Sequence, residues 1–178
     1  MTDYGNAEQT LLRSILSGKK DVANRATLGP MVPIQLFQAL RLIGMGSSIE
    51  EMVGDGAHAL VYQSGKRVGQ VLGNAVLPKA GKDLPKYLEL MRGVCLQLSI
   101  GQLALEKADN SAGILTLKVD ECVSCAGISG VKAPICNFEA GLVAGVVKVF
   151  TAREVKAVEV KCNAVGDSTC AVDAHILA

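Results

Sequence analysis

Two pairs of alternating segments, separated by one apolar helix, constrain the fold of this chain most. The first pair spans 102–107 and 114–120, and the second spans 155–162 and 169–176. In each segment the apolar side chains recur with the period of two that is typical of a half-buried strand. Turn residues separate the members of each pair, so the pattern predicts two antiparallel hairpins.

The rest of the chain reads as helices around this sheet. An apolar helix is expected from about 135 to 150, between the hairpins, and helical patterns precede residue 100. We therefore predict an α+β fold: a four-stranded antiparallel sheet with helices packed on it. Because 178 residues suit one core, we expect an N-terminal helix and linker over 1–24 and a single domain over 25–178.

Glycines recur every four residues in two of the expected helices. Gly65, Gly69 and Gly73 share one face of a helix from 57 to about 72, and Gly141 and Gly145 do the same in the helix from 135. Each glycine costs a helix roughly 1 kcal/mol relative to Ala, so a packing gain must offset it. The spacing predicts that a neighbouring element lies very close to each helix.

Local signals predict where helices begin and end. Gly44 should end an apolar helix over 34–43, and the segment 77–83, which contains Pro78, should break the chain. Asp83 is placed to cap the following helix.

Three cysteines and one glutamate form the spacing Glu-x2-Cys-x7-Cys with a further Cys upstream. They are Cys136, Glu159, Cys162 and Cys170. One carboxylate and three thiolates are donors that zinc accepts in a closed four-coordinate site, which is structural and not catalytic. The spacing alone leaves two alternatives open, namely a disulfide between Cys162 and Cys170, or three buried free thiols.

A second cysteine motif, Cys122-Val-Ser-Cys125, follows the first hairpin. It could be two structural thiols in a loop, a redox pair, or half of a second metal site. With Cys136, Cys162 and Cys170 assigned, the chain offers no further cysteine pair to complete such a site, except across a dimer axis.

Composition excludes several classes of function. Lys and Arg number 18 against 17 Asp and Glu, with no basic run, so we expect no nucleic-acid partner. No stretch has the roughly 18 uninterrupted apolar residues of a membrane span, and the first residues do not resemble a signal peptide. We expect a cytoplasmic protein with free or metal-bound cysteines, which forms a homodimer through its N-terminal helices.

No catalytic constellation is visible, so enzymatic activity stays uncertain. The chain has only two His, His58 and His175, and neither belongs to a Ser-His-Asp set. No nucleotide-binding loop is found.

The pattern around the four predicted metal ligands resembles the 4-vinyl reductase domain family. It consists of Cys136-Asn-Phe-Glu-Ala-Gly, a helix, Glu159-x2-Cys162, and Cys170 after a Gly-Asp turn. The resemblance implies a structural zinc on Cys136, Glu159, Cys162 and Cys170. It also implies a fold shared with vesicle-trafficking complex subunits and with the sensor domains of phenol-responsive activators. The chain lacks Trp, and neither His lies within 73–136, so the residues that hold phenol in those sensors are not expected here.

The resemblance further implies a small-molecule-binding module and not a reductase, since no nicotinamide or flavin site is visible. We expect a carrier, sensor or assembly factor for an apolar ligand such as a tetrapyrrole, with a role in chlorophyll biosynthesis or photosystem assembly. The alternatives are an enzyme acting on a vinyl tetrapyrrole and a ligand-free dimeric scaffold. The expected pocket lies between the helix after Asp83 and the central strands, and its residues, which could equally be plain core, are Tyr87, Met91, Leu103, Leu105 and Leu115.

Overall fold

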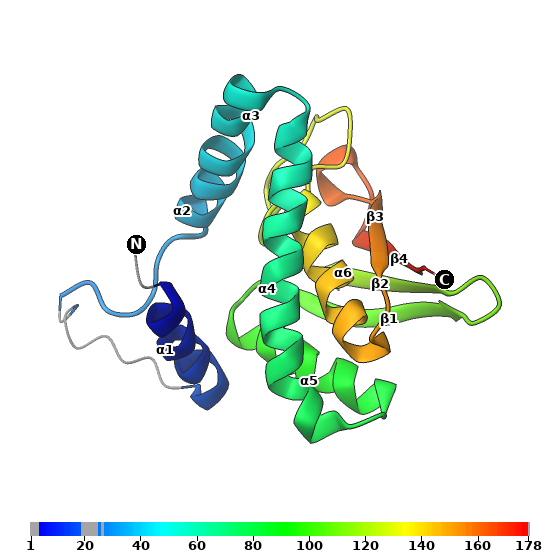
Figure 1. Cartoon of the computed structure of the whole chain (residues 1–178). Coiled ribbons are helices and arrows are strands. Elements are labelled where there is room, and N and C mark those ends of the chain that lie inside the picture. Colours follow the sequence, from blue (N-terminus) through cyan, green and yellow to red (C-terminus); the bar gives the residue numbers. More distant parts are fainter. Residues whose placement is uncertain (1–3, 19–24, 26, 178) are drawn as a thin grey trace.

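The computed structural model describes residues 4–18, 25 and 27–177, and it has the predicted α+β architecture (Figure 1). The predicted linker over 19–24 lies outside the described residues. Four strands form one antiparallel sheet in the order β1-β2-β4-β3. The strands are β1 (Gln102–Asp109), β2 (Ile114–Asp120), β3 (Val155–Lys161) and β4 (Cys170–Ile176). The helices are α1 (Tyr4–Ser17), α2 (Ile34–Gln38), the π-helix η1 (Ala39–Ser47), α3 (Ser48–Val53), α4 (Gly56–Ala80), α5 (Leu84–Gln97), α6 (Asn137–Thr151) and the 3-10 helix η2 (Asn163–Val165).

The sheet has one apolar face and one polar face, as the alternation predicts. Leu117 pairs with Val172 in the centre of the sheet, and both side chains are buried. On the opposite face Thr116 donates a hydrogen bond to Asp173 at 2.7 Å. The helices therefore cover one face only.

Two helices lie directly on the apolar face, and a third covers them. α5 contacts β1, α6 contacts β3 and β4, and α4 runs across both helices (Figure 1). A methyl group at Gly69 would overlap the carbonyl oxygen of Leu142, and one at Gly145 would overlap that of Lys66. The predicted close approach is thus confirmed, with α4 and α6 in backbone contact.

Two expected helix ends are wrong. α4 continues through Pro78 to Ala80, where Gly81 donates to Leu77 O at 2.8 Å with φ +63°. Proline so near a helix end removes only one backbone bond, and burial of Val76 and Ala80 holds the last turn. The predicted cap of the next helix is confirmed, because Lys86 N donates to Asp83 at 2.9 Å.

Gly44 likewise does not end its helix, because the chain passes from α2 through η1 into α3 without a break. In the wider π-helical turn the Ser48 N–H reaches Ile43 O, so backbone pairing persists through the glycine. We call residues 34–53 the N-terminal arm.

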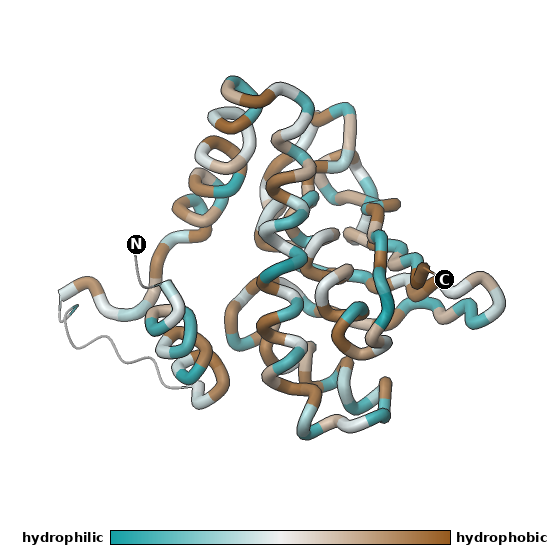
Figure 2. The backbone as a smooth tube through the Cα atoms, in the orientation of Figure 1, coloured by the Kyte–Doolittle hydropathy of each residue, from teal (hydrophilic) through white to brown (hydrophobic). Residues whose placement is uncertain are grey.

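The N-terminal arm carries many apolar side chains that are exposed in the single chain (Figure 2). Leu40 and Ile43 are 60% and 62% exposed, and Met52 is 81% exposed. Among the described residues, no helix combines the length and apolar character needed to cross a membrane.

Candidate metal centre

Five cysteines converge at one end of the sheet, below the first turn of α6. Cys122 and Cys125 lie in the loop after β2, which we call the cysteine loop (residues 121–126), and Cys136 precedes α6. Cys162 directly follows β3, and Cys170 begins β4. All five side chains are at most 2% exposed, and all are free thiols.

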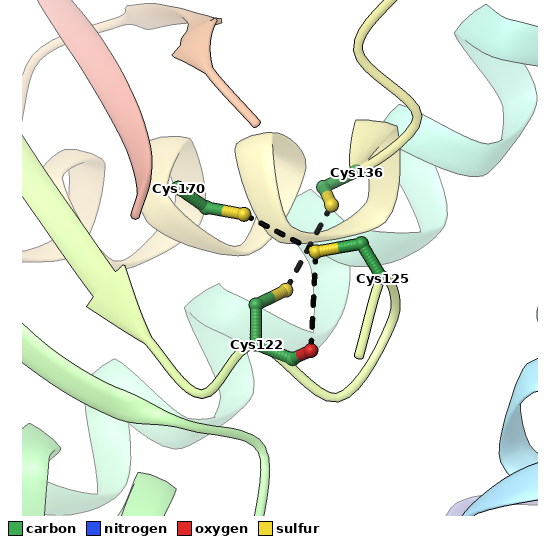
Figure 3. A group of neighbouring side chains, drawn as sticks. All are labelled: Cys122, Cys125, Cys136 and Cys170. Atoms are coloured by element: carbon green, nitrogen blue, oxygen red, sulfur yellow. Dashed lines mark hydrogen bonds between the residues drawn. The ribbon is translucent and has the colours of Figure 1, made fainter. Parts of the chain in front are cut away.

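The sulfur atoms are close enough to share a metal ion. Cys122 Sγ lies 3.7 Å from Cys136 Sγ, and Cys125 Sγ lies 3.3 Å from Cys170 Sγ (Figure 3). Cys136 Sγ lies 3.9 Å from Cys162 Sγ. Four sulfurs at the zinc–sulfur distance of about 2.3 Å form a tetrahedron with edges of about 3.8 Å. The spacing of the thiols therefore fits direct coordination.

The four predicted ligands lie together. The donor atoms of Cys136, Glu159, Cys162 and Cys170 are all within 4.8 Å of one another. Strand alternation turns Glu159 to the inner face, opposite Val172, and a bulge between Glu159 and Lys161 then brings Cys162 inward. The assignment of these residues as ligands stays a prediction.

Glu159 offers a buried oxygen to a cation. Its Oε2 accepts a hydrogen bond from Cys136 N at 2.8 Å. Its Oε1 is buried and has no hydrogen-bond partner among the described residues. Because buried carboxylate oxygens are normally satisfied, this atom fits a metal ligand.

The Cys-x2-Cys pair joins the same cluster. Cys122 and Cys125 form a second group of four with Cys136 and Cys170, again with all sulfurs within 4.8 Å of one another. The sequence showed the pair but not its neighbours, because the path of the loop after β2 carries no periodic pattern. The ligands that appeared to be missing are thus two cysteines already assigned to the first group.

The thiols influence one another strongly. Burial raises the pKa of Cys162 to about 12, and burial also raises the pKa of the Glu159 carboxyl. Hydrogen bonding to neighbouring thiols, with Cys122 the largest contributor, lowers the pKa of Cys125. A bound cation would favour the thiolate and carboxylate forms throughout the cluster.

Polar contacts tie the cysteine loop to the N-terminal arm. Gln38 Nε2 donates to Val123 O at 3.1 Å and to Ala126 O at 2.9 Å. The buried Ser124 donates to the buried Glu139 at the start of α6. Burial raises the pKa of the Glu139 carboxyl. Sequence reasoning missed these contacts, because no spacing links residue 38 to residues 123–139.

Arg41 anchors the arm at the same end of the molecule. The Arg41 side chain is 4% exposed and donates from Nη2 to Ile135 O at 2.7 Å, one residue before Cys136. The arm therefore contacts the chain on both sides of the metal-ligand candidates.

The residues predicted to line a pocket lie mainly in the core. Tyr87 and Met91 are fully buried, and the Tyr87 hydroxyl donates to Val146 O at 2.9 Å. Leu103 and Leu115 are also buried, whereas Leu105 is 41% exposed. A ligand-binding role for these five residues stays a prediction.

A larger hollow lies elsewhere, between α1, the segment before α2, and the connection from α5 to β1. We call it the apolar groove, and its volume is about 570 Å³. Val123 of the cysteine loop forms part of its wall. The other lining residues are Leu11, Ser14, Ile15, Pro30, Met31, Val32, Pro33, Ile34, Phe37, Gln97, Leu98, Ser99 and Ile100.

Comparisons with known proteins place these features in context. The profile of the vinyl-4-reductase domain family matches residues 115–176, which include the strands β2, β3 and β4. The protein MJ0150 of Methanocaldococcus jannaschii is 33% identical over 175 residues, covering 96% of this chain and 93% of that protein.

Three solved structures share the fold. A vinyl-4-reductase family protein from Methanocaldococcus jannaschii has a TM-score of 0.66 and 15% identity, covering 100% of this chain and 97% of that one. The phenol-responsive sensory domain of the transcription activator PoxR, solved with phenol, has a TM-score of 0.64 and 15% identity, covering 82% and 75%. A trafficking protein particle complex subunit 3 from Naegleria fowleri, covalently bound to palmitic acid, has a TM-score of 0.57 and 14% identity, covering 81% and 97%.

Proposed function

The chain belongs to the vinyl-4-reductase domain family, and from this premise we propose that it is a small-molecule-binding protein whose fold is stabilised by zinc. One observation carries the proposal: Val123 lies inside the Cys-x2-Cys motif and also lines the apolar groove. The metal centre and the groove therefore share the cysteine loop, and the metal would hold one wall of the ligand site in place.

Zinc suits the donor set best. Thiolates are soft ligands that select zinc over magnesium or calcium, and zinc accepts one carboxylate beside them. The donors are buried and supply every coordination position, so the site is closed and its role is structural. A reducing compartment such as the cytoplasm would keep the thiols available for the metal.

The groove suits a broad apolar ligand. Its volume of about 570 Å³ falls within the range of about 300–1,000 Å³ for small-molecule sites, which are mainly apolar with a few polar groups. Ser14, Gln97 and Ser99 supply polar groups among aliphatic walls. The structural neighbours with phenol and with palmitic acid support the general class of ligand. A tetrapyrrole or a lipid is the proposed ligand, and a carrier, sensor or assembly role follows; the link to chlorophyll biosynthesis rests on the family resemblance alone.

The test is the identification of molecules that co-purify with the protein from its native host. Mass and absorption spectra should show zinc and an apolar compound or pigment together. Ile34→Asp places a charge in the groove and should abolish retention of the compound. Leu40→Asp is the matched control, because Leu40 lies on the same arm but outside the groove lining, and it should retain the compound.

Absence of any co-purifying compound, with zinc present, would contradict the ligand half of the proposal and favour a dimeric scaffold. Chemical turnover of a bound vinyl tetrapyrrole with an added reductant would instead favour an enzyme.

A further inference from the structure

We propose that the cysteine cluster holds two metal ions bridged by Cys136 and Cys170. The inference rests on the proposed function only in requiring that the cluster binds metal. The starting observation is that two groups of four donors overlap in these two cysteines alone. One group adds Cys122 and Cys125, and the other adds Glu159 and Cys162.

The number of donors matches two tetrahedral ions that share an edge. Two separate four-coordinate sites need eight donors, and sharing two bridging thiolates reduces the need to six. The overlapping groups provide six donor residues, namely Cys122, Cys125, Cys136, Glu159, Cys162 and Cys170. A single ion with four of these ligands would leave two buried donors of the cluster without a metal.

The geometry places the two terminal pairs with separate parts of the chain. Cys122 and Cys125 come from the cysteine loop, and each is next to one proposed bridge, at 3.7 Å from Cys136 and 3.3 Å from Cys170 (Figure 3). Cys162 comes from the end of β3 and lies 3.9 Å from Cys136. These separations are close to the tetrahedral edge of about 3.8 Å expected for zinc thiolates.

Charge also favours a second ion. Five thiolates and one carboxylate carry six negative charges when all are deprotonated, and uncompensated buried charge is strongly unfavourable. One dication would leave four of these charges and two dications would leave two. The second ion thus permits all six donors to be deprotonated at once.

An iron–sulfur cluster fits less well. Such clusters place iron and inorganic sulfide between the cysteine ligands. The sulfurs of Cys122, Cys125, Cys136 and Cys170 already lie within 4.8 Å of one another, which suits direct coordination of single ions. We therefore assign two divalent thiophilic ions, with zinc as the chemical class.

The metal content of the full chain, reconstituted from the apo form with zinc, tests this assignment. Native mass spectrometry and elemental analysis should both give two zinc ions per chain. The double variant Cys122→Ser with Cys125→Ser should fall to one ion, and so should Glu159→Gln with Cys162→Ser. Cys95→Ser is the control, because Cys95 is buried in α5 away from the cluster, and it should keep two.

A cobalt titration of the unaltered protein tests the bridges without relying on the folding of any variant. The electron paramagnetic resonance signal of Co²⁺ should rise up to one equivalent and fall towards the second, because thiolate bridges couple the two ions. Two ions without this loss would overturn the bridging assignment. One zinc per chain would overturn the two-ion inference and leave the proposed function intact, zero zinc would overturn both, and acid-labile sulfide would replace the assignment with an iron–sulfur cluster.

Discussion

Four glycines determine how closely α4 and α6 approach each other. Gly65 and Gly69 on α4 face the backbone of α6, and Gly141 and Gly145 on α6 face the backbone of α4. Each position lacks a Cβ where one would overlap a carbonyl oxygen of the other helix. Close packing across this contact offsets the low helix propensity of glycine. Because α6 carries Cys136 at its start, the contact also helps to position the metal centre.

Gly69→Ala should therefore destabilise the protein. The added methyl group overlaps Leu142 O, a backbone atom that can move only with the helix, and overpacking costs about 1–3 kcal/mol. Gly93→Ala is the control, because nothing lies within 4 Å of that position on α5, and it should stabilise by up to about 1 kcal/mol. Urea unfolding measures both, and equal midpoints for the two variants would contradict the prediction.

Cys162→Ser should lower the thermal stability of the zinc-loaded protein sharply. Coordination of a structural zinc contributes about 10 kcal/mol or more to folding in small zinc domains, and a serine hydroxyl is a poor replacement for a thiolate. Ligand affinity of the folded fraction should stay similar, because Cys162 does not line the apolar groove. Calorimetry and binding of the co-purified compound check both parts, and an unchanged melting temperature would argue against a metal at Cys162.

At the scale of elements, the sequence predicts most where the signal is local. Alternation predicted β2 with its observed bounds, and Asp83 was correctly identified as a helix cap. The family resemblance is confirmed by the match of the family profile. The ends expected at Gly44 and near Pro78 were wrong, since tertiary packing can maintain a helix through a residue that weakens it.

The same distinction applies to the candidate site. Hairpin pairing and the bulge before Lys161 bring Glu159, Cys162 and Cys170 to one corner, and a hairpin can be predicted from alternation. The cysteine loop could not be placed in this way, because irregular backbone has no periodicity. Its position depends on contacts with the N-terminal arm and α6.

Leu115→Trp tests whether the layer between α5 and the sheet is a filled core or a pocket. Leu115 is 6% exposed and belongs to the same buried core as Tyr87 and Met91, so we expect overpacking to cost about 1–3 kcal/mol. Leu105→Trp, at an exposed position of the neighbouring strand, should change stability by at most about 0.5 kcal/mol. Loss of ligand binding in Leu115→Trp with little loss of stability would instead identify a pocket there.

At the scale of the whole molecule, the N-terminal arm is joined to the domain through few polar contacts and exposes an apolar surface. Gln38 and Arg41 attach it to the cysteine loop and to the residue before Cys136. Leu36, Leu40 and Ile43 remain exposed on the single chain. Extended apolar surface of this kind is typical of an interface, which supports the proposed homodimer.

Analytical ultracentrifugation at micromolar concentration should give about twice the chain mass of 18.6 kDa. Leu40→Asp combined with Ile43→Asp should shift the protein to the monomer, because a charge on each copy would be buried without a partner. The Glu51→Gln variant changes an exposed polar residue of the same arm and should remain dimeric. A monomer for the unaltered chain would disprove the predicted dimer.

Metal removal should loosen the N-terminal arm before it loosens the helical layer. The cysteine loop presents Val123 O and Ala126 O to Gln38, and its own conformation would be fixed by coordination of Cys122 and Cys125. Without metal, the loop and the arm should exchange backbone amide hydrogens faster, because local opening depends on the few contacts that hold a segment. The α4–α6 contact depends on glycine packing, so its amides should exchange at nearly the rate of the zinc-loaded protein. Gln38→Ala in the zinc-loaded protein is the matched control, since it should reproduce faster exchange in residues 34–47 with the metal content unchanged. Uniform acceleration across all helices after chelation would show that the metal stabilises the whole domain and not the connection between the cysteine loop and the arm.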